Sequence, residues 1–371
     1  MSGEKKTELT LTIDAGSESR EGEIVFKLDE YDYTTTCRVA QYYYEHEEDE
    51  EITLQTHSRG KGINLVFLGD GFDAENISNG DYLRVMNEQM ERFFDIEPYH
   101  TYRDYFNVST AIAVSPESGI GTVNTIRNTK FETTFTGEVG LRGNYSTIFN
   151  YAMEVSPVDE SNLNQSLIIV TPNTIDYGGI TEMWTDGSAI AFCPLSEDSY
   201  PYDARGIIQH EAGGHGFGKL GDEYIYHNTF IDFCDCTCCE HVFEFNIAKS
   251  LGWYENLSLT GKIHEVPWSH LIFDDRYSDV VDIYEGGFMH ARGVFRSEQN
   301  SCMNNNISYY NAISREAIVK RIMEYAGESY SFEKFVENDK RDAVNSLSRS
   351  AERPGVTVRG NQYAPRIHKG K

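Results

Sequence analysis

The sequence has no long apolar run. No stretch of about 18 or more apolar residues occurs among its 371 residues, so no segment is predicted to cross a bilayer as a helix. Residues 1–6 also lack the apolar core of a signal peptide. No internal repeat is visible.

Basic residues are scarce. The chain carries 32 Lys and Arg residues against 59 Asp and Glu residues, which gives a formal net charge of −27. Such an acidic surface repels phosphate backbones, and this excludes nucleic acid as a partner. Part of the acidic excess lies in residues 45–51, where only His46 interrupts the run, and we interpret this run as part of a solvated linker.

Cysteines are few and unevenly placed. The chain has seven, an odd number, so at least one thiol is unpaired or bound to a metal. Four of them crowd together as Cys234, Cys236, Cys238 and Cys239, and such close neighbours pair poorly with one another. Three interpretations stay open: disulfides to distant cysteines, a structural metal site that includes His241, or free thiols.

The composition is that of a folded globular protein, with 39% hydrophobic and 13% aromatic residues. Short segments typical of β-strands occur at residues 9–13, 24–28 and 34–39. These strands bury too little surface to form a core alone. The predicted organisation is a β-rich N-terminal segment, an acidic linker, a main domain and a polar, irregular tail, at residues 1–44, 45–59, 60–345 and 346–371.

The main domain alternates between strands and helices. Apolar strands are predicted at residues 63–68, 106–114, 166–170 and 188–192. Helices are predicted at residues 81–94, 145–155, from about 203 onward, and 311–323. Between the third and fourth helices the chain is expected to be rich in loops. This alternation predicts an α/β (α+β) fold with a mixed, twisted sheet.

The third helix carries two histidines that could share a metal ion. His210 is followed directly by Glu211, and His215 comes five positions after His210. Zinc hydrolases often place two histidines four residues apart on one helix face, with a glutamate after the first. On an ideal α-helix a spacing of five leaves the side chains about 140° apart. A single π-turn would align them, and Gly213 and Gly214 suit such a distortion.

A third ligand is expected after the second histidine. A glycine such as Gly218 can end a helix in a left-handed turn, so that the chain bends back toward the metal. Asp222 is the preferred third ligand and Glu223 the alternative, because zinc accepts an oxygen ligand beside two imidazoles. The predicted cofactor is Zn²⁺, and Glu211 is the predicted general base that takes a proton from the metal-bound water.

These residues resemble the motif of the bacterial IgA metallopeptidase family. The match comprises His210, Glu211, His215, Gly218 and residues 222–224, with further likeness at residues 68–72, 105–108, 113–119, 296–298 and 301–303. It covers roughly residues 60–330. The resemblance implies a zincin-like, metzincin-like catalytic domain and a zinc endopeptidase that acts on proteins or peptides. It also implies a secreted, periplasmic or cell-surface location, with immunoglobulin or another glycoprotein as the substrate.

The similarity to metzincins adds three expectations. Met303 would form a methionine turn beneath the metal ligands. Residues 188–192 would be either an edge strand that pairs with an extended substrate or a buried sheet strand. Tyr309 or Tyr310 would help to stabilise the oxyanion, unless both are packing residues.

Other interpretations stay open at this point. Arg20, Ile24, Val39 and Gln41 resemble the last strands of a BACON domain, a carbohydrate-associated β-sandwich, over some 30 residues. A surface glycoprotein-binding module with a structural or inactive zinc site is the alternative to an enzyme. A different zinc hydrolase, such as an amidase, would use the same residues. No pattern in the sequence indicates the oligomeric state or the cleavage specificity.

Overall fold

The computed structural model describes residues 20–28, 33–43, 45–137, 139–232, 238–340 and 365–370. The side chains of residues 33, 40 and 238–240 are excepted. The strand expected at residues 9–13 lies outside the described residues.

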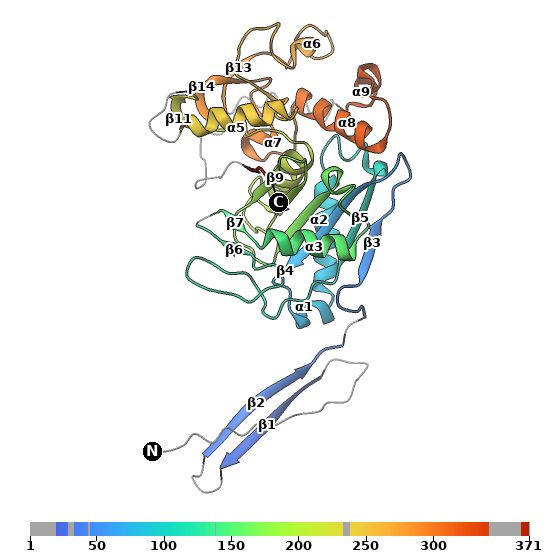
Figure 1. Ribbon diagram of the computed structural model, residues 1–371, viewed down its shortest axis with the longest axis vertical. Helices are drawn as coiled ribbons and strands as arrows, with labels where there is room; N and C mark the ends of the chain where they lie inside the picture. Colours follow the sequence, from blue (N-terminus) through green and yellow to red (C-terminus); the bar gives the residue numbers. More distant parts are fainter. Residues whose placement is uncertain are drawn as a thin grey trace.

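A seven-stranded mixed sheet forms the centre of the protein (Figure 1). Its strands follow the spatial order β15 (Arg366–His368), β9 (Ile180–Trp184), β10 (Ala189–Phe192), β8 (Leu167–Pro172), β4 (Ile63–Asp70), β5 (Phe106–Ala111) and β3 (Glu51–Gln55). Strands β10, β8, β4 and β5 are parallel to one another, whereas β9 and β3 pair antiparallel with their inner neighbours. The predicted α/β fold with a mixed sheet is confirmed.

The middle strands are buried on both faces. Leu65, Phe67 and Ile169 have no exposed surface, because helices cover the sheet on both sides. Burying each such side chain stabilises the folded state by roughly 1.5–3 kcal/mol. This continuous apolar core gives the site above the sheet a rigid base.

Two helices have the bounds that their periodicity predicts, namely α2 (Asp81–Phe94) and α3 (Tyr145–Val155). They lie on opposite faces of the sheet, as the alternation of side chains along β9 makes clear. Thr181 donates a hydrogen bond to the helix that carries the two histidines, whereas its neighbour Glu182 accepts one from Tyr145 of α3. Helix α2 contacts the histidine-bearing helix.

A second layer of structure lies at one end of the central sheet, at the top of Figure 1. It contains a four-stranded sheet made of β11 (Ile225–Phe230), β14 (Met289–Arg296), β12 (Leu257–Ser258) and β13 (Tyr284–Gly287). Its helices are α5 (Cys238–Ser250), α6 (Ser269–Ile272), α7 (Cys302–Asn305), α8 (Ala312–Ala326) and α9 (Phe332–Asn338). The expectation of a loop-rich region is therefore wrong for much of this segment.

Short elements complete the described chain. They are α1 (Ala74–Ser78), the 3-10 helices η1 (Arg103–Tyr105) and η2 (Leu163–Gln165), and the two-residue strands β6 (Thr134–Phe135) and β7 (Leu141–Arg142). Strands β1 (Arg20–Leu28) and β2 (Tyr33–Gln41) form a separate antiparallel hairpin, which Figure 1 shows at the opposite end from the second layer. None of the described helices is both long and apolar enough to traverse a bilayer.

Two predicted boundaries need correction. Residues 51–55 were expected in the acidic linker, but they form β3 and pair with β5 in the central sheet. Residues 366–368 were expected in an irregular tail, but they form β15 beside β9. The buried carboxylate of Glu182 holds β15 in place, since it accepts hydrogen bonds from His368 at 2.6 Å and Arg366 at 3.3 Å.

Candidate metal centre

The two histidines lie on a π-helix, η3 (Gln209–Phe217), which continues directly from α4 (Ala204–Ile208). Asp203 begins this run, because its carboxylate accepts a hydrogen bond from the Gly206 amide at 2.9 Å. A π-helix has about one extra residue per turn, so positions five apart lie on one face. The predicted π-turn is confirmed, and it covers the whole motif rather than a single turn.

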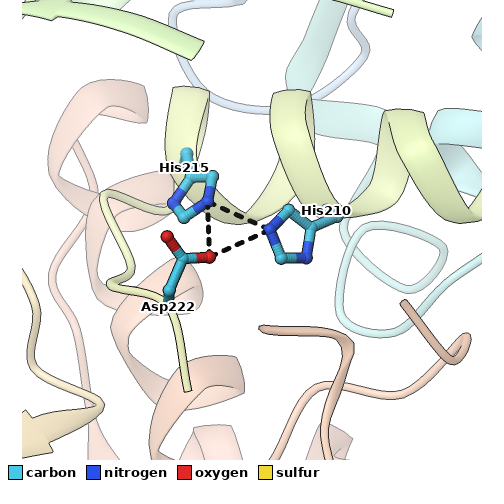
Figure 2. Close-up of side chains that lie close together, drawn as sticks. All are labelled: His210, His215 and Asp222. Atoms are coloured by element: carbon cyan, nitrogen blue, oxygen red, sulfur yellow. Dashed lines mark hydrogen bonds and ion pairs between the residues drawn. The ribbon is translucent and has the colours of Figure 1, made fainter. Parts of the chain in front are cut away.

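His210, His215 and Asp222 converge on one point (Figure 2). His210 Nε2, His215 Nε2 and Asp222 Oδ1 lie 3.1 Å from one another along all three edges of a triangle. All three side chains are almost completely buried. Three ligands of a tetrahedral zinc at 2.0–2.1 Å are separated by roughly 3.3 Å, so the triangle has the dimensions of a zinc site.

Both imidazoles are held in the tautomer that a metal requires. His210 Nδ1 lies 2.9 Å from the Cys302 carbonyl, and His215 Nδ1 lies 2.8 Å from the Leu220 carbonyl. A carbonyl only accepts hydrogen bonds, so each Nδ1 must carry the proton. In a neutral ring Nε2 then presents a lone pair toward the centre of the triangle.

This arrangement attracts positive charge. Burial alone would raise the pKa of Asp222, but His215 and His210 lower it to about 2. Burial opposes a charged His210, yet the hydrogen bond to Asp222 raises its pKa well above the usual value. One proton could bridge only two of the three converging atoms, whereas a metal ion would bind all three. The donor set therefore fits a zinc ion.

Gly213 and Gly214 are needed for close packing as well as for helix distortion. A Cβ atom on Gly214 would lie 2.2 Å from Met303 Sδ, and one on Gly213 would lie 2.5 Å from the Tyr310 hydroxyl oxygen. Met303, in α7, thus packs directly against the backbone of the π-helix. Its neighbour Cys302 supplies the carbonyl that holds His210.

We predict that Gly214→Ala destabilises the protein by about 1–3 kcal/mol, because the new methyl group collides with the thioether of Met303. Denaturant unfolding would measure this change. The double variant Gly214→Ala/Met303→Ala should be more stable than the sum of the two single effects, since the collision is removed. Strictly additive effects would contradict the proposed contact.

Glu211 faces a small pocket next to the triangle. It shares this pocket with His210, Gly178, Gly179, Ile207, Val139, Tyr177 and Asn306. Burial raises the pKa of Glu211, although His210 and His215 act in the opposite direction. The Thr181 hydroxyl lies 2.9 Å from Glu211 Oε2 and 2.8 Å from its backbone carbonyl. Thr181 fixes the carboxylate in position, and no sequence motif indicated it.

Glu223, the alternative third ligand, lies outside the triangle. Its carboxylate accepts hydrogen bonds from Ser301 at 2.6 Å, Asn311 at 2.7 Å and Asn256 at 2.8 Å. Its backbone amide donates to the Met303 carbonyl at 2.7 Å. Glu223 therefore joins the segment that carries Asp222 to α7, which carries Met303. The two adjacent acidic residues thus have different roles, because Asp222 belongs to the triangle and Glu223 holds the neighbouring segments together.

The structure does not bring Tyr309 or Tyr310 to the open side of the triangle. Both rings are buried, and their hydroxyl groups donate to protein oxygens, Tyr309 to Glu298 and Tyr310 to the Gln209 carbonyl. The expectation that they stabilise an oxyanion is replaced by a packing role. Tyr310 is joined by Tyr99, which donates to the Gly213 carbonyl at 2.6 Å, so two tyrosines support the π-helix backbone.

Strand β10 is an inner strand, so the edge-strand interpretation of residues 188–192 is wrong. It pairs with β9 on one side and β8 on the other, and each of its residues is buried. It cannot add a substrate strand, because both of its hydrogen-bonding edges are occupied.

Glu298 is a further buried carboxylate in this region, and it is predicted to make stability depend on pH. Burial raises the pKa of Glu298 to about 7, even though Arg315 and Tyr309 lower it. A raised pKa stabilises the folded state below about pH 4.5, and this contribution is lost as the pH rises to about 7. It amounts to at most about 3 kcal/mol, at 1.36 kcal/mol per pKa unit.

The Glu298→Gln variant should lack this dependence. The free energy of unfolding of the variant minus that of the parent protein should be larger at pH 8 than at pH 5, by about 1–3 kcal/mol, because only the parent loses stability over this range. Urea denaturation at both pH values measures the difference. An equal difference at the two pH values would mean that Glu298 is not protonated in the folded protein.

The cysteine-rich run lies outside the described residues, apart from the backbone of Cys238 and Cys239 at the start of α5. Its three interpretations therefore stay predictions. The ring of His241 is described, and its Nδ1 lies 2.9 Å from His290 Nε2. Elsewhere in the described chain, Cys37, Cys193 and Cys302 are free thiols.

Two imidazoles and a carboxylate that converge beside a buried glutamate form the arrangement used by metal-dependent hydrolases. A family model described as IgA Peptidase M64 matches residues 52–247, and the chain belongs to this family. It is thus a peptidase of a metallopeptidase family, with proteins or peptides as substrates. The match begins after the β1–β2 hairpin and gives no support to the BACON resemblance. No curated protein matches the chain significantly.

Proposed function

We propose that the protein is a zinc-dependent endopeptidase in which His210, His215 and Asp222 bind the metal and Glu211 is the general base. The observation that carries the proposal is the triangle of three ligand atoms, each 3.1 Å from the other two. Both histidine rings already point the metal-binding nitrogen inward.

The residues around the triangle support the chemistry of peptide hydrolysis. When bound, zinc lowers the pKa of a coordinated water toward about 7 and polarises the scissile carbonyl. Glu211 accepts the proton that the attacking water loses and transfers it to the leaving amine. Thr181 orients the Glu211 carboxylate during both transfers. Gly179 lines the pocket, and a Cβ atom there would lie 3.0 Å from Glu211 Cγ, so this glycine lets the backbone approach the Glu211 side chain closely.

A purely structural metal site would not need Glu211. A structural zinc is enclosed by four protein ligands, whereas three ligand atoms converge within the described part of this chain and a carboxylate lies in the adjacent pocket. An open fourth position is the mark of a catalytic site. This favours the enzyme over a glycoprotein-binding module with an inactive centre.

Family membership supports an extracellular protein substrate, with immunoglobulin or another glycoprotein as the first candidates. We propose a secreted, periplasmic or cell-surface location on the same ground. The test combines metal analysis with casein and IgA digestion. The enzyme should contain about one zinc per chain, lose activity with 1,10-phenanthroline and regain it with added zinc. Hydrolysis that is unaffected by metal removal would exclude the proposed mechanism.

A further inference from the structure

A second cavity, of about 380 Å³, lies beyond the C-terminal end of the π-helix. Five segments meet there: η2, the β9–β10 turn, residues 218–219, residues 251–255 and helix α8. It shares no lining residue with the pocket beside Glu211. Its volume falls within the range of about 300–1,000 Å³ that is usual for small-molecule sites.

Lys219 is the most unusual residue in this cavity. Only 3% of it is exposed, and its backbone adopts the left-handed region with φ of +52°. Its ammonium lies 5.3 Å from the centre of the Trp253 ring and has no hydrogen-bond or ion-pair partner among the described residues. A buried ammonium without a counterion is unfavourable unless a ligand supplies one.

Arg321 is a second cation in the same cavity without a carboxylate partner within the described chain. One of its terminal nitrogens donates to the Tyr325 hydroxyl at 3.2 Å, and its buried Nε has no hydrogen-bond partner there. Lys320, on the same helix, is different, since it pairs with Glu255 at 3.4 Å and Glu316 at 3.2 Å.

Three acidic residues also line the cavity, namely Asp186, Glu255 and Glu324. Asp186 attracts Lys219 electrostatically, but one of its carboxylate oxygens accepts hydrogen bonds from the amide and hydroxyl of Ser188. Glu255 is paired with Lys320. Lys219 and Arg321 are therefore two basic groups that face one cavity without an ion-pair partner in the described part of the chain, and together they can hold an anion.

We propose that this cavity binds a small organic acid, with its carboxylate between the Lys219 ammonium and the Arg321 guanidinium. Trp253, Tyr325 and Leu251 line the same cavity and provide apolar and aromatic surface for the body of the ligand. Arg321 offers donors in the planar arrangement that suits a carboxylate. The site is separate from the proposed peptidase centre and does not depend on its activity.

Calorimetric titration of the zinc-loaded full chain with N-acetyl-tyrosine tests the proposal. N-acetyl-tyrosinamide, which differs only in lacking the carboxylate, is the matched ligand control. The acid should bind, and the amide should bind at least about tenfold more weakly, a difference of about 1.4 kcal/mol. Equal binding of acid and amide, or no binding of either, would overturn the proposal.

Three variants locate the bound acid. Lys219→Met and Arg321→Gln should each weaken binding at least about tenfold, whereas Lys320→Met should change it less than about threefold, because that lysine is already paired. Zinc content and thermal midpoint should be measured for each variant, since Lys219 lies close to the metal ligands in sequence. If the acid binds equally well to Lys219→Met and Arg321→Gln, it occupies another site, the metal included, and the proposal fails.

Discussion

The Glu211→Gln variant is expected to keep its full metal content and to hydrolyse protein about 10²–10⁴-fold more slowly. Glutamine has the shape of glutamate and can still accept the hydrogen bond from Thr181. It cannot accept a proton from the attacking water, so only the chemical step is affected. Metal analysis and kcat/KM on a fluorogenic peptide measure the two effects separately.

Glu197→Gln is a suitable control, because Glu197 is an exposed glutamate outside the pocket and its change should leave kcat/KM unaltered. A fully active Glu211→Gln enzyme would remove Glu211 from the mechanism. Loss of the metal together with the activity would instead make Glu211 part of the metal site.

Asp222→Ala should lower metal affinity at least about 100-fold. This loss is larger than the roughly 10–100-fold loss of affinity that follows when a residue that hydrogen-bonds to a metal ligand is removed. The change removes one of three converging ligand atoms and leaves His210 and His215 without the carboxylate that attracts positive charge to them. Competition with a chelating zinc indicator measures the affinity. Peptidase activity should fall in parallel at limiting zinc.

Glu223→Gln is the matched control, because Glu223 is the adjacent carboxylate and is equally buried. It should retain the metal and lose about 1–3 kcal/mol of unfolding free energy, since the new amide faces side chains that donate hydrogen bonds. If Glu223→Gln lost the metal and Asp222→Ala kept it, the assignment of the third ligand would be reversed.

Local patterns were sufficient to predict several parts of this structure. The bounds of α2 and α3 follow from the spacing of apolar residues, which sets the buried face of a helix. The π-turn follows from geometry alone, because a five-residue spacing can align two imidazoles only in a wider helix.

Other parts depend on contacts between residues that are distant in sequence. Strand β3 pairs with β5, and β15 pairs with β9 across more than 180 residues, so neither short polar segment shows its partner locally. The choice between Asp222 and Glu223 was also open, since both are acidic. It depends on Ser301, Asn311 and Asn256, which hydrogen-bond to Glu223 from three other segments.

Deleting one of the paired glycines would give His210 and His215 the four-residue spacing of an ordinary α-helix. The same deletion would narrow the helix to α geometry between the two histidines and change the path of the backbone there, although both histidines would stay on one face. Tyr99, which donates to the Gly213 carbonyl, would then face a different backbone atom. Converting this motif to the shorter one therefore requires simultaneous changes in the residues that surround it. A one-residue deletion alone would produce the four-residue histidine spacing without the surrounding contacts that this spacing needs.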